Sequence, residues 1–208
     1  MGLIVDFIAG YLVAFVGFVA PGMLNVLAAK ISITENKRAA MLFIFGTLTI
    51  VLIQAFTGVY FAKFLDSHPG VSNTLKQFGT VIFVLLTIAF LFKGFQVKKP
   101  KKEIEIKSKQ NRYVYGLMMA SFNMFAIPFF AISSLTLASK ELFDFSLVSI
   151  IVFSIAAVLG TFTIFYSYAI FFKKIEDKAD VLINNIYFIL AAFTGFVAIL
   201  SIYRMINS

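Results

Sequence analysis

Long apolar runs alternate with short polar segments along the chain. Charged residues and turn signals separate six such runs, at residues 3–29, 40–63, 75–96, 113–138, 145–172 and 181–204. Each run is long enough for a tilted helix to cross a hydrocarbon core about 30 Å thick, which takes about 20 residues. The pattern therefore predicts an all-α integral membrane protein with six transmembrane helices.

Basic residues collect in alternate loops between these runs. Most of the 18 Lys and Arg residues fall between runs one and two, three and four, or five and six. Cytoplasmic loops of membrane proteins carry an excess of Lys and Arg, so these three loops are expected in the cytoplasm. Both termini are then expected outside.

The longest linker, residues 98–112 (KKPKKEIEIKSKQNR), divides one transmembrane domain (1–208) into halves of three spans, about 1–97 and 113–208. Because three is odd, a repeat that relates the halves must be inverted in the membrane. Two inverted three-helix repeats are typical of secondary transporters, whose sites form near the midplane where discontinuous helices meet. The linker itself is either a topology anchor or a patch for anionic lipid headgroups.

Each half carries a break in its first span. GFVAPGMLNVLAAK, residues 17–30, contains Pro21, Gly22 and Asn25, and SFNMFAIPFF, residues 121–130, contains Asn123 and Pro128. A proline inside a helix removes a hydrogen bond, so Pro21 and Pro128 should leave the carbonyls of residues 17 and 124 without their helical donors. Freed carbonyls at membrane depth need protein or a water-filled cavity beside them. The breaks are candidate substrate-binding sites; the alternative is a pair of proline kinks bridged by asparagine.

Other polar residues in the spans add candidates. Gln54, in the middle of the second run, either lines the substrate cavity or makes an interhelical hydrogen bond. Asp6, close to the outer end of the first run, is a candidate coupling residue or reaches headgroup water. Tyr168 in GTFTIFYSY is a candidate gating residue whose hydroxyl faces the bundle or its own helix. Four glycines are expected to permit close helix packing: Gly46, Gly58, Gly160 and Gly195.

Composition narrows the function classes. A chain that is 61% hydrophobic with mean hydropathy +0.95 has too little polar surface for a soluble domain. The net charge of +8 resides in loops, so nucleic acid is not an expected partner. With no Cys and a single His, His68, the chain offers no thiolate or His-based metal site and no catalytic triad. We expect neither an enzyme nor a cofactor or metal site.

The order and spacing of these motifs resemble the lysine-exporter (LysE, RhtB-like) family of bacterial inner-membrane amino-acid exporters. APGMLNVLAAK is similar to the family's Pro-Gly-Pro region, ENKRAA and FGTLT follow as in the family, and FNMFAIPFF stands where the family has Asn-Pro-Lys. Met23 replaces the second proline, and Met124 and Phe125 replace Pro and Lys. Thr47 follows Gly46 where many members carry an aspartate. The resemblance thus implies a divergent branch, with Thr47 at a coupling or gating position.

Together these observations predict a secondary transporter that exports small, zwitterionic amino-acid-like solutes across the bacterial cytoplasmic membrane, either driven by an ion gradient or facilitated. The loss of the aspartate argues against lysine or arginine as substrate. Membrane lipids and the small solute are the expected partners, and the sequence is also compatible with a homo-oligomer. Two alternatives remain: an inorganic-ion transporter on a similar fold, and a non-transporting membrane scaffold or assembly factor.

Overall fold

The structure is a computed structural model that describes residues 2–20, 22–68, 70, 111–123 and 125–171. It also describes scattered helical positions between 84 and 95 and between 191 and 203. The expected spans 75–96 and 181–204 therefore fall mostly outside the described residues, as do Pro21 and all but the last two residues of the linker 98–112.

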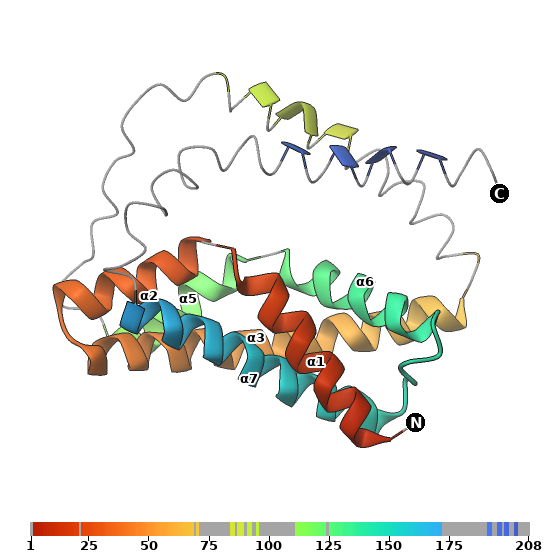
Figure 1. Ribbon diagram of the computed structural model, residues 1–208, viewed down its shortest axis with the longest axis horizontal. Helices are drawn as coiled ribbons and strands as arrows, with labels where there is room; N and C mark the ends of the chain where they lie inside the picture. The colour runs from red at the N-terminus through yellow and green to blue at the C-terminus, as the bar shows by residue number, and fades with distance from the viewer. Residues whose placement is uncertain are drawn as a thin grey trace. The chain divides into compact units, whose positions relative to one another are not determined.

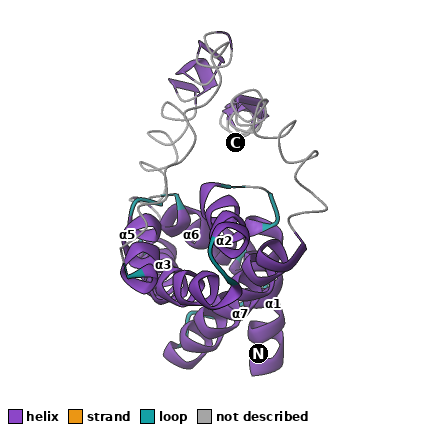
Figure 2. Cartoon of the chain, turned by 90° about the vertical axis from the view of Figure 1, so that its left-hand side faces the viewer, coloured by secondary structure: helices purple, strands orange, loops and turns teal. Residues whose placement is uncertain are grey.

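Every regular element among the described residues is an α-helix. The chain forms α1 (Leu3–Phe18), α2 (Met23–Thr34), α3 (Lys37–Ser67), α5 (Arg112–Ser121), α6 (Ala126–Ala138) and α7 (Leu147–Phe171). All six lie in one compact unit, Met1–Ser67 with Ile106–Ile175. Figure 1 shows α3 and α7 as its long helices, and Figure 2 shows the helices of this unit closer to end-on, as a bundle.

The second unit comprises His68–Glu105 and Glu176–Ser208. Its two segments meet where Gly195 lies against the side chain of Thr87, so that a Cβ at position 195 would be 3.3 Å from the threonine methyl group. Ala191 and Ala198 are buried.

Two of the described helices, α3 and α7, are long and apolar enough to cross a membrane on their own. The pairs α1–α2 and α5–α6 pass the same test only when joined, and they bend by 77° and 64° at their breaks. The described residues thus supply two membrane-spanning helices, or up to four if each bent pair is one span. This confirms an all-helical chain with two to four candidate membrane-spanning helices among the described residues.

Helix directions follow from close backbone contacts at glycines. A Cβ at Gly10 of α1 would lie 2.3 Å from the carbonyl oxygen of Phe153, and one at Gly160 of α7 would lie equally close to that of Tyr11. Residue numbers increase together along both helices, so α1 and α7 run parallel. By the same reasoning α3 runs parallel to α5 and α6, because Gly46 lies on Tyr113 and Gly58 lies on Ile127.

Helices α3 and α7 run antiparallel. Phe45 stacks on Phe162, whereas further along α3 residues between 52 and 57 line a groove with residues between 151 and 155 of α7. Lipid tails are as apolar as leucine, so close packing at small residues stabilises such helix pairs more than burial from water does. Gly46, Gly58 and Gly160 therefore have the packing role expected from the sequence.

Candidate functional site

The first helix break lies between α1 and α2, and a buried amide closes it. The Nδ2 group of Asn25, only 2% exposed, donates hydrogen bonds to the carbonyl oxygens of Phe18 (2.7 Å) and Ala20 (2.9 Å). From α7, the hydroxyl of Tyr168 donates to the carbonyl of Val19 at 2.9 Å. Three carbonyls at this break therefore receive side-chain donors.

The second break lies between α5 and α6 and is closed from a different helix. Gln54 of α3 is 6% exposed, and its Nε2 group donates to the carbonyl oxygens of Ala120 (3.0 Å) and Asn123 (3.1 Å). Its Oε1 atom is buried without a hydrogen-bond partner. The second break therefore leaves one buried acceptor open.

Proline has a smaller part in the second break than expected. The helix ends at Ser121, and Pro128 is the third residue of the new helix α6. The first-turn N–H groups of a helix have no partner within the helix, so a proline costs little there. The break thus precedes Pro128, which lies exposed in the first turn of α6.

Helices that start at a loop differ from helices that start at a break. The oxygens of Asn36, Asn111 and Ser146 accept backbone N–H groups at the starts of α3, α5 and α7. In contrast, the residues before α2 and α6, Gly22 and Phe125, provide no side-chain cap, and neither does Gly2 before α1. The breaks therefore present two helix N-termini whose first-turn N–H groups have no side-chain acceptor, each carrying a partial positive charge.

A carboxylate, Asp144, accepts hydrogen bonds in the turn before α7. The backbone N–H of Ser146 donates to Asp144 at 2.9 Å, and this bond, with those of the hydroxyls of Ser146 and Ser149, lowers the pKa of Asp144 from 3.8 to about 2. Asp144 therefore remains an anion in the turn before α7 at any physiological pH.

Matching contacts relate the two halves of this unit. Gly160 lies on the backbone of Tyr11 and Phe15, and Gly46 lies on the backbone of Tyr113 and Leu117, one helical turn apart in both cases. The hydroxyl of Tyr11 donates to Thr163 (3.1 Å), and that of Tyr113 pairs with Thr49 (3.0 Å). The signal in the sequence is GTLTI at 46–50 against GTFTI at 160–164.

The predicted site residues form two groups. Asn25 and Tyr168 meet at the first break, and Gln54 meets Asn123 at the second. The two groups are linked through α6: a Cβ at Gly17 of α1 would lie 2.3 Å from the ring of Phe129, and the ring of Phe18 contacts that of Phe130.

A row of aromatic rings lies beside the two breaks. The rings follow one another in edge-on or tilted contact in the order Phe153, Phe130, Phe18 and Phe165. Phe18 belongs to the first break, because its carbonyl accepts from Asn25, and Phe130 belongs to α6, so this row of rings connects the two breaks.

Two predicted coupling or gating residues have different surroundings. Thr47 is fully buried, and its hydroxyl donates to the carbonyl of Phe43 in its own helix at 3.0 Å. Asp6 is also fully buried, but neither carboxylate oxygen has a hydrogen-bond partner.

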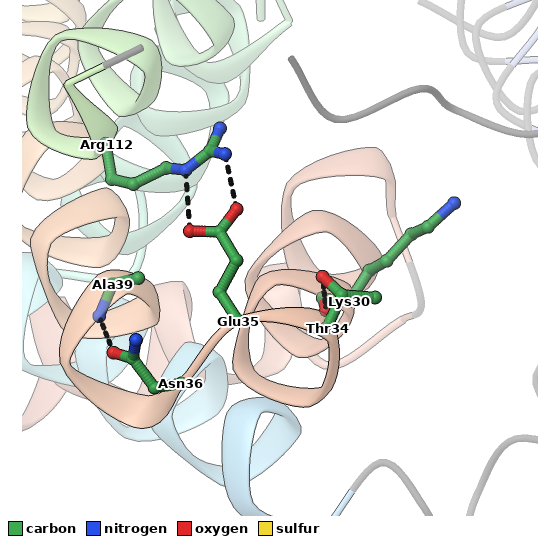
Figure 3. A network of polar contacts seen from close by, with 6 residues as sticks. All are labelled: Lys30, Thr34, Glu35, Asn36, Ala39 and Arg112. Carbon is green, nitrogen blue, oxygen red and sulfur yellow. Dashed lines mark hydrogen bonds and ion pairs between the residues drawn. The ribbon is translucent and has the colours of Figure 1, made fainter. Parts of the chain in front are cut away.

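An ion pair that sequence reasoning missed joins Glu35, after α2, to Arg112, the first residue of α5. The guanidinium donates from Nε to Oε2 at 3.0 Å and from a second nitrogen to Oε1, and Figure 3 shows this two-pronged contact. Arg112 is 5% exposed and also lies over the ring of Tyr115. Bidentate geometry of this kind fixes both position and orientation.

Fold and site together define a helical membrane protein with two discontinuous helix pairs. Comparisons with protein-family models, with curated proteins and with solved structures find no match to the chain. The resemblance to the LysE family therefore stays a prediction that rests on the motifs.

Proposed function

We propose that this protein is a six-span secondary transporter that exports small, zwitterionic amino-acid-like solutes, with the architecture of two inverted repeats. The observation that carries the proposal is the pair of uncapped helix starts at the breaks, at Gly22 and Phe125. In secondary transporters, such half-helix N-termini point at the anionic group of the substrate.

A zwitterion needs partners for both of its charged groups. The first-turn N–H groups of α2 and the positive end of its dipole suit a carboxylate. The open Oε1 of Gln54 at the second break is an acceptor suited to an ammonium group. We propose that a solute engages both groups, with its carboxylate at the start of α2 and its ammonium group at Gln54.

The matching contacts of the two halves support the repeat. In both, a glycine of the unbroken helix packs on the first segment of a broken span, and a Tyr–Thr hydroxyl pair lies nearby. The Glu35–Arg112 ion pair supports the even spacing of the spans, because it joins two loops that the positive-inside rule assigns to the same side of the membrane. We propose the bacterial cytoplasmic membrane as the location, with both termini outside.

The test introduces a carboxylate side chain at the start of α2, where it competes with the carboxylate of the solute for the first-turn N–H groups. Gly22 has extended backbone angles (φ −96°, ψ 172°), and the nearest atom to an added Cβ is 4.0 Å away. Gly22→Asp should therefore fold, cap α2 and occupy the donors offered to the solute. We expect efflux from proteoliposomes to fall at least tenfold.

The matched control is Gly70→Asp, which adds the same carboxylate at an exposed position where nothing lies within 4 Å of an added Cβ. This variant should transport as the wild type does. Normal efflux by Gly22→Asp would exclude the start of α2 as the solute site.

A further inference from the structure

One buried carboxylate has no role in the fold described so far. Asp6 of α1 is 0% exposed, and both of its carboxylate oxygens lack a hydrogen-bond partner. The other acidic residues in the described part of the chain, Glu35, Asp66, Glu141 and Asp144, all retain exposure. Asp6 is therefore the single buried acidic residue of that part.

The packing of α1 on α7 places this carboxylate. Asp6, Gly10 and Ala14 are the buried residues of α1 and form one stripe at four-residue spacing. Gly10 touches the backbone of Phe153 in a parallel helix pair, so one turn earlier on each helix brings Asp6 opposite Ser149. Ser149 is itself 2% exposed, and its hydroxyl accepts a hydrogen bond from Ser146 and bonds to Asp144, so this position is an enclosed polar spot next to the turn before α7.

No basic side chain on the packed helices compensates Asp6. Besides Asp6 the only ionisable side chain in α1 is Tyr11, and α6 and α7 contain no acidic or basic residue; Tyr166 and Tyr168 lie at the far end of α7. Lys140, Glu141 and Asp144 belong to the turn before α7, and none hydrogen-bonds to Asp6. The start of α1 offers Asp6 only the partial positive charge of a helix N-terminus, and a buried carboxylate without a full counter-charge is destabilising, which a bound cation would offset.

We propose that Asp6 binds the monovalent cation, H⁺ or Na⁺, that drives transport. A proton would bind a carboxylate oxygen and form the neutral acid; Na⁺ would share that oxygen with the Ser149 hydroxyl. No covalent bond of the solute changes. Separation of α1 from α7 would release the cation. The site is near the outer end of α1 in the proposed orientation, as suits a cation that enters from outside while the solute leaves. This inference rests on the proposed function.

The first experiment measures cation binding without transport. Purified wild type, Asp6→Asn and Asp66→Asn are compared for ²²Na⁺ binding and for protons released on alkalinisation, the latter read by the infrared C=O band of a protonated carboxyl. Asp66 is an exposed carboxylate at the end of α3 and serves as the matched control. We expect Asp6→Asn alone to lose one Na⁺ or one titrating proton per chain. No loss by either method overturns the proposal.

The second experiment measures transport in proteoliposomes with a Na⁺ or a pH gradient. One gradient should accelerate wild-type solute flux, and Asp6→Asn should lose at least tenfold of that acceleration while solute counterflow without a gradient persists. Ser149→Ala should weaken coupling only if the cation is Na⁺. An Asp6→Asn variant that responds to the gradient as the wild type does contradicts the proposal. Absence of any wild-type flux contradicts the transporter instead, and the binding experiment then decides the role of Asp6.

Discussion

At the scale of residues, two buried amides donate the hydrogen bonds that a continuous helix would supply from its own backbone. Asn25 and Gln54 each donate two hydrogen bonds to carbonyls that the breaks would otherwise leave open. Hydrocarbon offers no donor to such carbonyls, so these amides make the breaks tolerable at membrane depth. The sequence indicated both residues as polar positions in apolar runs, but it could not indicate that Gln54 serves a break on another helix.

Replacement of Gln54 tests this role. Gln54→Leu should lower the free energy of unfolding by about 1–3 kcal/mol, because two carbonyls lose their donor while the volume hardly changes. Unfolding in detergent and SDS mixtures measures the difference. Thr57→Val, at an exposed position three residues along α3, should change stability by less than about 0.5 kcal/mol. Equal stability of Gln54→Leu and the wild type would mean that Gln54 does not hold the second break.

At the scale of elements, the apolar runs and prolines of the sequence predicted where the long helices and the breaks lie. They did not predict why the second break forms. The long apolar runs at 40–63 and 145–172 became α3 and α7, and both breaks fell in the runs that contain a proline with a nearby asparagine. The second break nevertheless starts before Pro128, which merely suits the first turn of α6. Helix pairing was not predictable in detail, because a glycine in an apolar run does not indicate which backbone approaches it.

Glycine contacts between elements give a sharp prediction. A Cβ at Gly46 would lie 2.0 Å from the carbonyl oxygen of Tyr113, which is backbone and cannot rotate away. Gly46→Ala should therefore force α3 and α5 apart and lower the free energy of unfolding by about 1–3 kcal/mol. Thermal unfolding in detergent measures it.

The matched control for this substitution is Gly70→Ala, at a helical position where nothing lies within 4 Å of an added Cβ. This variant should be as stable as the wild type or slightly more so. A fully stable Gly46→Ala would contradict the close approach of α3 and α5.

At the scale of the whole molecule, the proposed orientation ties loop charge to helix direction. The chain has no cysteine, so single introduced cysteines report their side without background. Arg38→Cys and Lys140→Cys are both at exposed positions, the first beside the Glu35–Arg112 ion pair and the second after α6. In intact cells, an impermeant thiol reagent should label position 140 and spare position 38. Labelling of position 38 from outside would mean that the orientation is inverted.

The claim that the broken helices form a solute pathway is tested most directly by flux. Purified protein in liposomes loaded with a panel of radiolabelled amino acids and related zwitterions should release at least one solute with saturable kinetics, at a rate well above that of protein-free liposomes. Unlabelled solute of the same kind should compete with this release. Release equal to that of protein-free liposomes across the whole panel would contradict the account.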